Sequence, residues 1–250
     1  MKYSNRMIAT AFALFAGLWL ISSNASAAPM LDLAILVDIS GGGQNKLDNW
    51  SDMQAYLTDL VQNHLPESNT RIGLIEFGDN ANTLYGFNDS QDRDDIAAVT
   101  STIVHFGGHT NTIGAVQAAI DLFDTQSTQE NDKAVLLFTD GTPNRPAGNV
   151  DPCRLSPDLF MRSIDVLVAG IGERYAAYGQ DKHDCLVQSY DDMTTIDRYG
   201  ADELAQSTSW VTSRLYQQGG QTINEPATLP VLLTGLIGMV VGIRLRRSKA

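Results

Sequence analysis

The sequence lacks the motifs on which most enzyme classes depend. Only two cysteines and four histidines occur among its 250 residues. It contains no Gly-x-Ser-x-Gly elbow, no Walker loop and no His-Glu-x-x-His pair. The histidines are scattered, and the cysteines lie too far apart along the chain for a typical zinc site. These absences exclude the common hydrolase, nucleotide-binding and zinc-protease patterns, so we expect that the protein is not an enzyme.

Positive charge is scarce away from the two ends of the chain. Six of the 17 basic residues lie at the ends: Lys2, Arg6, Arg244, Arg246, Arg247 and Lys249. Residues 28–243 therefore hold 11 basic and 29 acidic residues, a net charge of −18. Such a surface repels nucleic acid and favours cations, so we expect no nucleic-acid partner. A solvated acidic face explains the same charge without a special function.

Long apolar runs occur only near the ends. The N-terminal run, residues 7–21, follows Lys2 and Arg6 and precedes the small-residue site Ala25-Ser26-Ala27. This order is typical of a secretory signal peptide, which we place at residues 1–27. An uncleaved anchor is the alternative, but the run is shorter than the roughly 20 residues of a spanning helix. The sequence therefore predicts export.

The C-terminal run, residues 229–243, precedes the basic tail and follows a linker at residues 219–228. A helix of this length measures about 22 Å, against a hydrocarbon core of about 30 Å. This ending resembles the PEP-CTERM sorting signal of Gram-negative bacteria, which consists of Pro-Glu-Pro, an apolar helix and terminal arginines. Here the motif reads Asn-Glu-Pro at residues 224–226, so Asn224 replaces the first proline. The resemblance implies transient membrane contact of residues 229–250, cleavage by an exosortase-type protease, and delivery to the cell envelope, outer surface or extracellular matrix. A plain tail anchor is the alternative.

Between these segments, residues 28–218 alternate apolar strands with amphipathic helices. Alternation of this kind predicts an α/β fold: a doubly wound, mainly parallel sheet with helices on both faces. We expect strands at residues 31–38, 71–79, 83–87, 133–141, 163–172 and 191–197, and helices at residues 45–66, 90–106, 113–123 and 201–217.

Polar residues lie at the ends of two predicted strands and in one glycine-rich loop. Asp38 and Ser40 come from the stretch "VDIS", Asp140 from "FTDG", and Thr110 from "GGHTNT". Ligands of open α/β sheets bind beyond the carboxyl ends of the strands, so these groups should converge. Two carboxylates beside hydroxyls suit a hard divalent cation, Mg²⁺ or else Mn²⁺ or Ca²⁺.

These motifs, in their order and spacing, resemble the von Willebrand factor A domain. Its metal-ion-dependent adhesion site (MIDAS) uses Asp-x-Ser-x-Ser, a threonine and an aspartate, which correspond to Asp38, Ser40, Thr110 and Asp140. Gly42 stands where the second serine belongs, so one hydroxyl ligand is absent. The resemblance implies an adhesion protein whose cation binds a carboxylate of a protein or polysaccharide partner. His109, in the same loop, is a weaker ligand candidate.

Two other functions compete with adhesion. One is a structural envelope or matrix protein with a metal-free site, since Gly42 removes a ligand. The other is a metal-dependent hydrolase, because doubly wound phosphatases also place an aspartate after the first strand. Those enzymes use Asp-x-Asp, whereas Ser40 occupies the second position here.

The two cysteines, Cys153 and Cys185, both lie in the predicted exported part. Cysteine pairs in oxidising compartments usually form disulfides. The sequence therefore predicts a Cys153–Cys185 disulfide.

Overall fold

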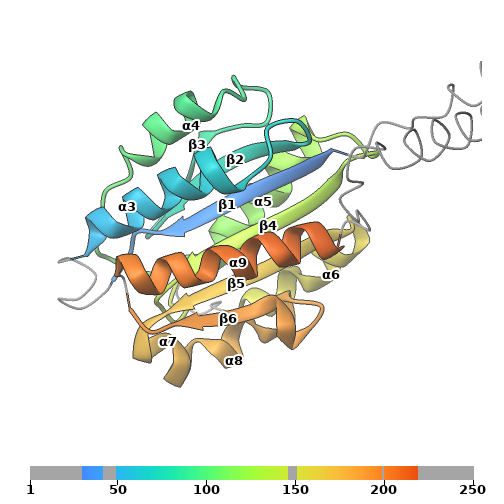
Figure 1. Ribbon diagram of the computed structural model, residues 1–250. Helices are drawn as coiled ribbons and strands as arrows, with labels where there is room; N and C mark the ends of the chain where they lie inside the picture. The colour runs from blue at the N-terminus through green and yellow to red at the C-terminus, as the bar shows by residue number, and fades with distance from the viewer. Residues whose placement is uncertain (1–29, 42–48, 146–150, 199, 219–250) are drawn as a thin grey trace, which may run out of the picture.

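Six strands form a single sheet in the order β3-β2-β1-β4-β5-β6 (Figure 1). The computed structural model describes residues 30–41, 49–145, 151–198 and 200–218. All neighbouring strands are parallel except β3, which pairs with β2 in the antiparallel sense. The strands are β1 (Leu31–Asp38), β2 (Thr70–Phe77), β3 (Ala81–Tyr85), β4 (Asp132–Thr139), β5 (Ile164–Ile171) and β6 (Met193–Ile196).

Helices cover both faces of this sheet. In Figure 1, α3 and α9 lie in front of the sheet and α5 lies behind it. The described helices are α3 (Trp50–Asp59), α4 (Arg93–Thr100), α5 (Thr112–Gln126), α6 (Ser156–Met161), α7 (Gly172–Tyr178), α8 (Gln180–His183) and α9 (Ala201–Gln218), with short π or 3₁₀ turns at η1 (Leu60–His64), η2 (Pro152–Leu155), η3 (Asp184–Leu186) and η4 (Tyr190–Asp192). The predicted doubly wound α/β fold is thus confirmed.

The central strand β1 is buried on both faces, which explains the apolar run at residues 33–37. Successive side chains of a strand point to opposite faces. Leu33, Ile35 and Val37 pack in the core beneath α3 and α9, whereas Ala34 and Leu36 pack in the core beneath α5. The two polar residues of β1 lie near its ends: Asp32, which is buried and paired with Arg71, and Asp38, the last residue.

The chain winds outward from β1 in two directions, and this sets the position of the candidate site. It first passes from β1 to β2 and β3 on one side, then returns to β4 and continues through β5 and β6 on the other. The strand order therefore reverses between β1 and β4. A crevice outside the carboxyl ends of the strands at such a reversal is the usual ligand site of these sheets. We call this end of the sheet the carboxyl edge and the other end the amino edge.

The prediction for the helix at residues 90–106 is wrong at both ends. Its N-cap is Asp92, whose Oδ1 accepts the Asp94 N–H at 2.8 Å, and not Ser90. The helix ends at Thr100, because hydroxyls at its end bond back to carbonyls three residues earlier. Phe106 consequently lies in the following loop and is 83% exposed instead of facing the core. The α6, α7 and α8 helices were not predicted.

Several sequence predictions lie outside the described residues. These are the signal peptide, the sorting signal and its apolar run, and Gly42. Within residues 30–218, as far as they are described, no helix is both long enough and apolar enough to span a membrane.

Candidate functional site

Asp38 is the centre of a buried polar cluster at the carboxyl edge. Its side chain is 1% exposed and accepts hydrogen bonds through both oxygens. Oδ1 accepts from the Ser40 N–H at 2.8 Å and from the Ser40 hydroxyl at 2.5 Å. Oδ2 accepts from the Thr139 hydroxyl at 2.7 Å. These bonds hold the carboxylate in one orientation at the end of β1.

Thr110 reaches the same cluster from the loop between α4 and α5. Its Oγ1 lies 2.7 Å from the Ser40 Oγ, and both residues are buried. The Thr110 N–H donates to the Asn144 Oδ1 at 2.8 Å, and the Thr110 carbonyl accepts from the N–H groups of Asn144 and Arg145 at 3.0 and 3.3 Å. These bonds join the loop that carries Thr110 to the loop that follows β4. Through the Ser40 hydroxyl, three predicted site residues lie together: Asp38, Ser40 and Thr110.

Asp140, the fourth predicted site residue, directly follows β4 and is partly buried. Its neighbour Gly141 explains how closely the two loops approach. A Cβ atom at Gly141 would lie 2.6 Å from the Thr110 Oγ1, so a larger residue would displace that hydroxyl. The Gly141 N–H also donates to the Thr139 hydroxyl at 3.2 Å. The structure therefore places Asp140 at the same strand end as the cluster.

The donor set fits a hard divalent cation. Asp38 and Asp140 supply carboxylate oxygens, and Ser40 and Thr110 supply hydroxyl oxygens, which are the ligand types of Mg²⁺, Mn²⁺ and Ca²⁺. The Ser40 Oγ lies between two of the other donors, 2.5 Å from the Asp38 Oδ1 and 2.7 Å from the Thr110 Oγ1. Gly42, the position of the absent hydroxyl, belongs to the residues that are not described.

A buried histidine lies near enough to this cluster to interact with the charge of Asp38. His183 is completely buried, and its Nδ1 lies 2.8 Å from the Gly179 carbonyl. Burial lowers the pKa of His183, although the Gly179 hydrogen bond and the negative charge of Asp38 oppose the shift. The Tyr175 ring packs against it, with 5.6 Å between ring centroids. Burial raises the pKa of Tyr175 well above its usual value.

The His109 side chain is hydrogen-bonded to Asp79, which is not among the four candidate ligands. Its Nδ1 lies 2.8 Å from the Asp79 Oδ1, and both side chains are about half exposed. Hydrogen bonds from His109 lower the pKa of the Asp79 carboxyl. The Arg145 guanidinium lies nearby, with its Nε 3.8 Å from the same Asp79 oxygen. His109 thus belongs to a group of charged and polar side chains beside the cluster.

Sequence reasoning did not identify the contributions of Thr139, Gly141 and Asn144. Thr139 orients Asp38, Gly141 makes room for Thr110, and Asn144 holds the Thr110 backbone. All three follow or end β4, so their place in the "FTDGTPN" stretch was the signal that could have revealed them.

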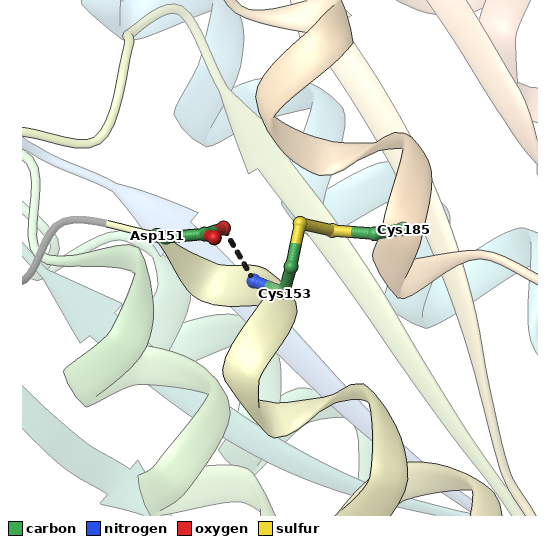
Figure 2. A group of neighbouring side chains, drawn as sticks. All are labelled: Asp151, Cys153 and Cys185. Carbon is green, nitrogen blue, oxygen red and sulfur yellow. Dashed lines mark hydrogen bonds between the residues drawn. A yellow bond between two sulfur atoms is a disulfide. The ribbon is translucent and has the colours of Figure 1, made fainter.

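The cysteines form the predicted disulfide, with 5.3 Å between their Cα atoms. Figure 2 shows Asp151 beside it, with its carboxylate accepting the Cys153 N–H at 2.9 Å. These three residues lie close enough to resemble a metal cluster. Both sulfurs are consumed by the disulfide, however, and only a thiolate is a good metal ligand. The group is therefore a structural cross-link.

The fold and the buried oxygen cluster together define a class of protein: a doubly wound α/β domain with a cation-type site where the strand order reverses. A sequence model of the von Willebrand factor type A domain matches residues 32–189. The chain belongs to this family. None of the curated proteins matches the sequence closely enough to count as a relative.

Solved structures of the mussel byssus protein proximal thread matrix protein 1 are similar to this chain. One, with a zinc-occupied MIDAS motif, shares 21% sequence identity at a TM-score of 0.64, and the match covers 75% of this chain and 46% of the other. Another structure of the same mussel protein gives a TM-score of 0.63 at the same identity and coverage. The match thus spans less than half of the mussel protein. At this identity the likeness establishes the shared fold.

Proposed function

We propose that this protein is an exported, non-enzymatic binding protein that uses a divalent cation to hold a carboxylate of its partner. The observation that carries the proposal is the convergence of Asp38, Ser40 and Thr110 at the carboxyl edge, where the strand order reverses. Asp140 follows the neighbouring strand β4. A bound divalent cation would supply a positive centre for the partner's carboxylate. The protein's own residues hold its ligands in place and exclude bulk water from Asp38 and Ser40.

The chemistry of the cluster supports binding over hydrolysis. Ser40 stands where the doubly wound phosphatases carry their second aspartate, and its hydroxyl donates to Asp38. The nearby His183 is buried and hydrogen-bonded to a backbone carbonyl, and burial lowers its pKa. A metal-dependent hydrolase needs an acid or base that reaches the substrate. Neither residue meets this requirement.

Export and sorting are part of the proposal. The disulfide fits an oxidising compartment, and the zinc-occupied structural neighbour is a thread matrix protein. We assign the protein to the cell envelope, outer surface or extracellular matrix of a Gram-negative bacterium. The predicted signal peptide directs export, and the predicted sorting signal at residues 219–250 directs transient membrane contact and exosortase cleavage. Its partner is a protein or polysaccharide of that compartment.

The direct test is calorimetric titration of the exported, purified protein with Mg²⁺, Mn²⁺ and Ca²⁺. We expect one site per chain with at least one of these ions, together with a rise in thermal stability, because a ligand that binds only the folded state stabilises it. If millimolar metal produces no heat and no shift in melting temperature, the proposed function is wrong. The second candidate function, a structural protein with a metal-free site, would then remain. Gly42 is the observation that favours this second candidate.

Gly42→Ser should tighten cation binding by about tenfold, because it restores the hydroxyl at the motif's second serine position. Tenfold corresponds to about 1.4 kcal/mol of binding free energy. Calorimetry on the two proteins under identical conditions measures the change. Gly42→Ala is the matched control, since it adds a side chain without an oxygen. Equal affinities of the Ser and Ala variants would show that position 42 does not reach the ion.

A further inference from the structure

We propose that the rim of the candidate cation site selects a protein partner whose Asp or Glu is flanked by apolar side chains. This inference rests on the proposed function and names the partner class that the function leaves open. The selecting groups are the exposed side chains of Val104, Phe106 and Tyr178 and the guanidinium of Arg145. We call these four residues the rim.

The exposed large hydrophobic side chains of the described residues gather at the two edges of the sheet. Val104, Phe106 and Tyr178 lie in or beside the loops of the carboxyl edge and are 55%, 83% and 69% exposed. The others immediately precede the strands β1, β5 and β6, and therefore lie at the amino edge: Met30, Phe160, Met161 and Tyr190. The candidate site thus has its own group of exposed apolar side chains.

The loop that presents Phe106 is fastened to the end of β1. The N–H groups of Phe106 and Gly107 both donate to the Ile39 carbonyl, at 3.0 and 3.2 Å. His105 beside them bonds to the Gly41 carbonyl and packs on Trp50, with 5.6 Å between ring centroids. Gly107 takes a φ of +75°, which other residues rarely adopt. The Phe106 backbone is therefore held at Ile39, the residue between Asp38 and Ser40, while its side chain remains exposed.

Tyr178 approaches the site from the opposite side. It ends α7, which Figure 1 shows at the same edge as the end of β1. Its carbonyl lies 3.5 Å from the Thr142 hydroxyl, in the loop after Asp140. The next residue, Gly179, packs against the Gly141 carbonyl, where an added Cβ would lie 3.2 Å away. Two residues with exposed aromatic side chains are thus joined through their backbones to the segments that carry the candidate ligands, Phe106 to the end of β1 and Tyr178 to the loop after β4.

Arg145 adds positive charge to this edge of an otherwise acidic domain. Its backbone N–H bonds to the Thr110 carbonyl, which fixes it beside the candidate ligands. Its guanidinium lies 3.4 Å from the His109 ring and 3.8 Å from Asp79, and the side chain is 43% exposed. An incoming carboxylate therefore meets both a candidate cation site and a guanidinium, a complementary arrangement for an acidic group.

The amide side chains near the rim favour a protein partner over a polysaccharide. A sugar chain presents many hydroxyls and needs side-chain amides and carboxylates that remain available. Here the Asn144 Oδ1 accepts from Thr110, and the Asn111 side chain bonds to Gly114 and Asp79. Besides the His109–Asp79 pair, the edge presents exposed aromatic and aliphatic side chains and the Arg145 guanidinium. Aromatic residues and arginine are the types enriched at the energetic centres of protein interfaces.

The test is selection of disulfide-cyclised peptides with one fixed Asp and random flanks, displayed on phage, against the full exported chain with Mn²⁺ and with elution by EDTA. We expect apolar residues beside the Asp in the eluted peptides. Phe106→Ser and Tyr178→Ser should each weaken a synthetic copy of the best peptide by about tenfold or more, and Arg145→Gln by a smaller factor. Phe160→Ser is the matched control, because Phe160 is 78% exposed at the amino edge.

Calorimetric titration of each variant with Mn²⁺ separates this inference from the proposed function. If wild-type protein binds no cation, both fall. If cation affinity is intact but the peptides show no apolar preference, or if the Phe106 and Tyr178 variants bind as the Phe160 variant does, the inference alone is wrong. EDTA-sensitive binding of polygalacturonate, in the absence of any peptide binding, would also overturn it in favour of a polysaccharide partner.

Discussion

Asp38→Ala is expected to weaken divalent-cation binding by at least about 100-fold. Loss of residues that merely support a metal ligand already costs about 10- to 100-fold in affinity, and Asp38 is proposed as a ligand itself. The change also leaves the Ser40 and Thr139 donors without their buried acceptor. Each unsatisfied buried donor costs about 1–3 kcal/mol. Calorimetric titration with Mn²⁺ measures the affinity, and circular dichroism with chemical denaturation measures the fold and its stability.

Two further variants make this result decisive. Asp38→Asn keeps an acceptor oxygen for the Ser40 N–H while removing the negative charge, so it should fold as wild type and still lose the ion. Asp121→Ala removes an exposed carboxylate on α5 that accepts a hydrogen bond from Gln117, and should leave affinity within about twofold. Wild-type affinity in folded Asp38→Asn would place the cation elsewhere.

Removal of the Cys153–Cys185 disulfide is expected to lower the free energy of unfolding by about 3–4 kcal/mol. The two cysteines are separated by 32 positions, and the chain-entropy treatment of a loop of this length gives that value. For a domain of this size the loss corresponds to a fall in melting temperature of about 10 °C. Guanidinium denaturation of the Cys153→Ala, Cys185→Ala double variant measures it.

The cross-link also joins segments on either side of the candidate site. Cys153 lies in η2, after the loop that follows Asp140, and Cys185 lies in η3, two residues after the buried His183. The Ser156 hydroxyl donates to the Cys185 carbonyl at 2.6 Å and remains when the sulfur bond is broken. Wild-type protein under reducing conditions is the control, since it keeps both side chains and loses only the bond. A change below about 1 kcal/mol in both proteins would contradict the prediction.

The sequence was sufficient to predict the sheet and the convergence of Asp38, Ser40 and Thr110. Apolar runs that end in polar residues mark the carboxyl ends of buried strands, and a doubly wound sheet brings such ends together. The role of Thr139 could not be predicted, because a threonine at the end of a strand fits strand propensity whether or not its hydroxyl binds a carboxylate. Only the distance to Asp38 distinguishes the two cases.

The exposed position of Phe106 was missed for a different reason. Spacing from Ile96 and Val99 continued a helical pattern through Ile103 and Phe106. Hydroxyl groups at Thr100, Ser101 and Thr102 compete for backbone carbonyls at the helix end, and a pattern of apolar residues does not register them. The helix stops there, Ile103 remains buried, and Phe106 passes to the surface.

The arrangement of the two edges determines how the domain responds to a pulling force. β1 begins at Leu31 at the amino edge, and α9 runs back to that edge and ends at Gln218 (Figure 1). A load between either terminus of the domain and a partner held at Asp38 therefore acts along the strands. β1 is hydrogen-bonded over its length to β2 and over most of it to β4. Tension in this direction shears both ladders at once, whereas a sideways pull would open them one bond at a time.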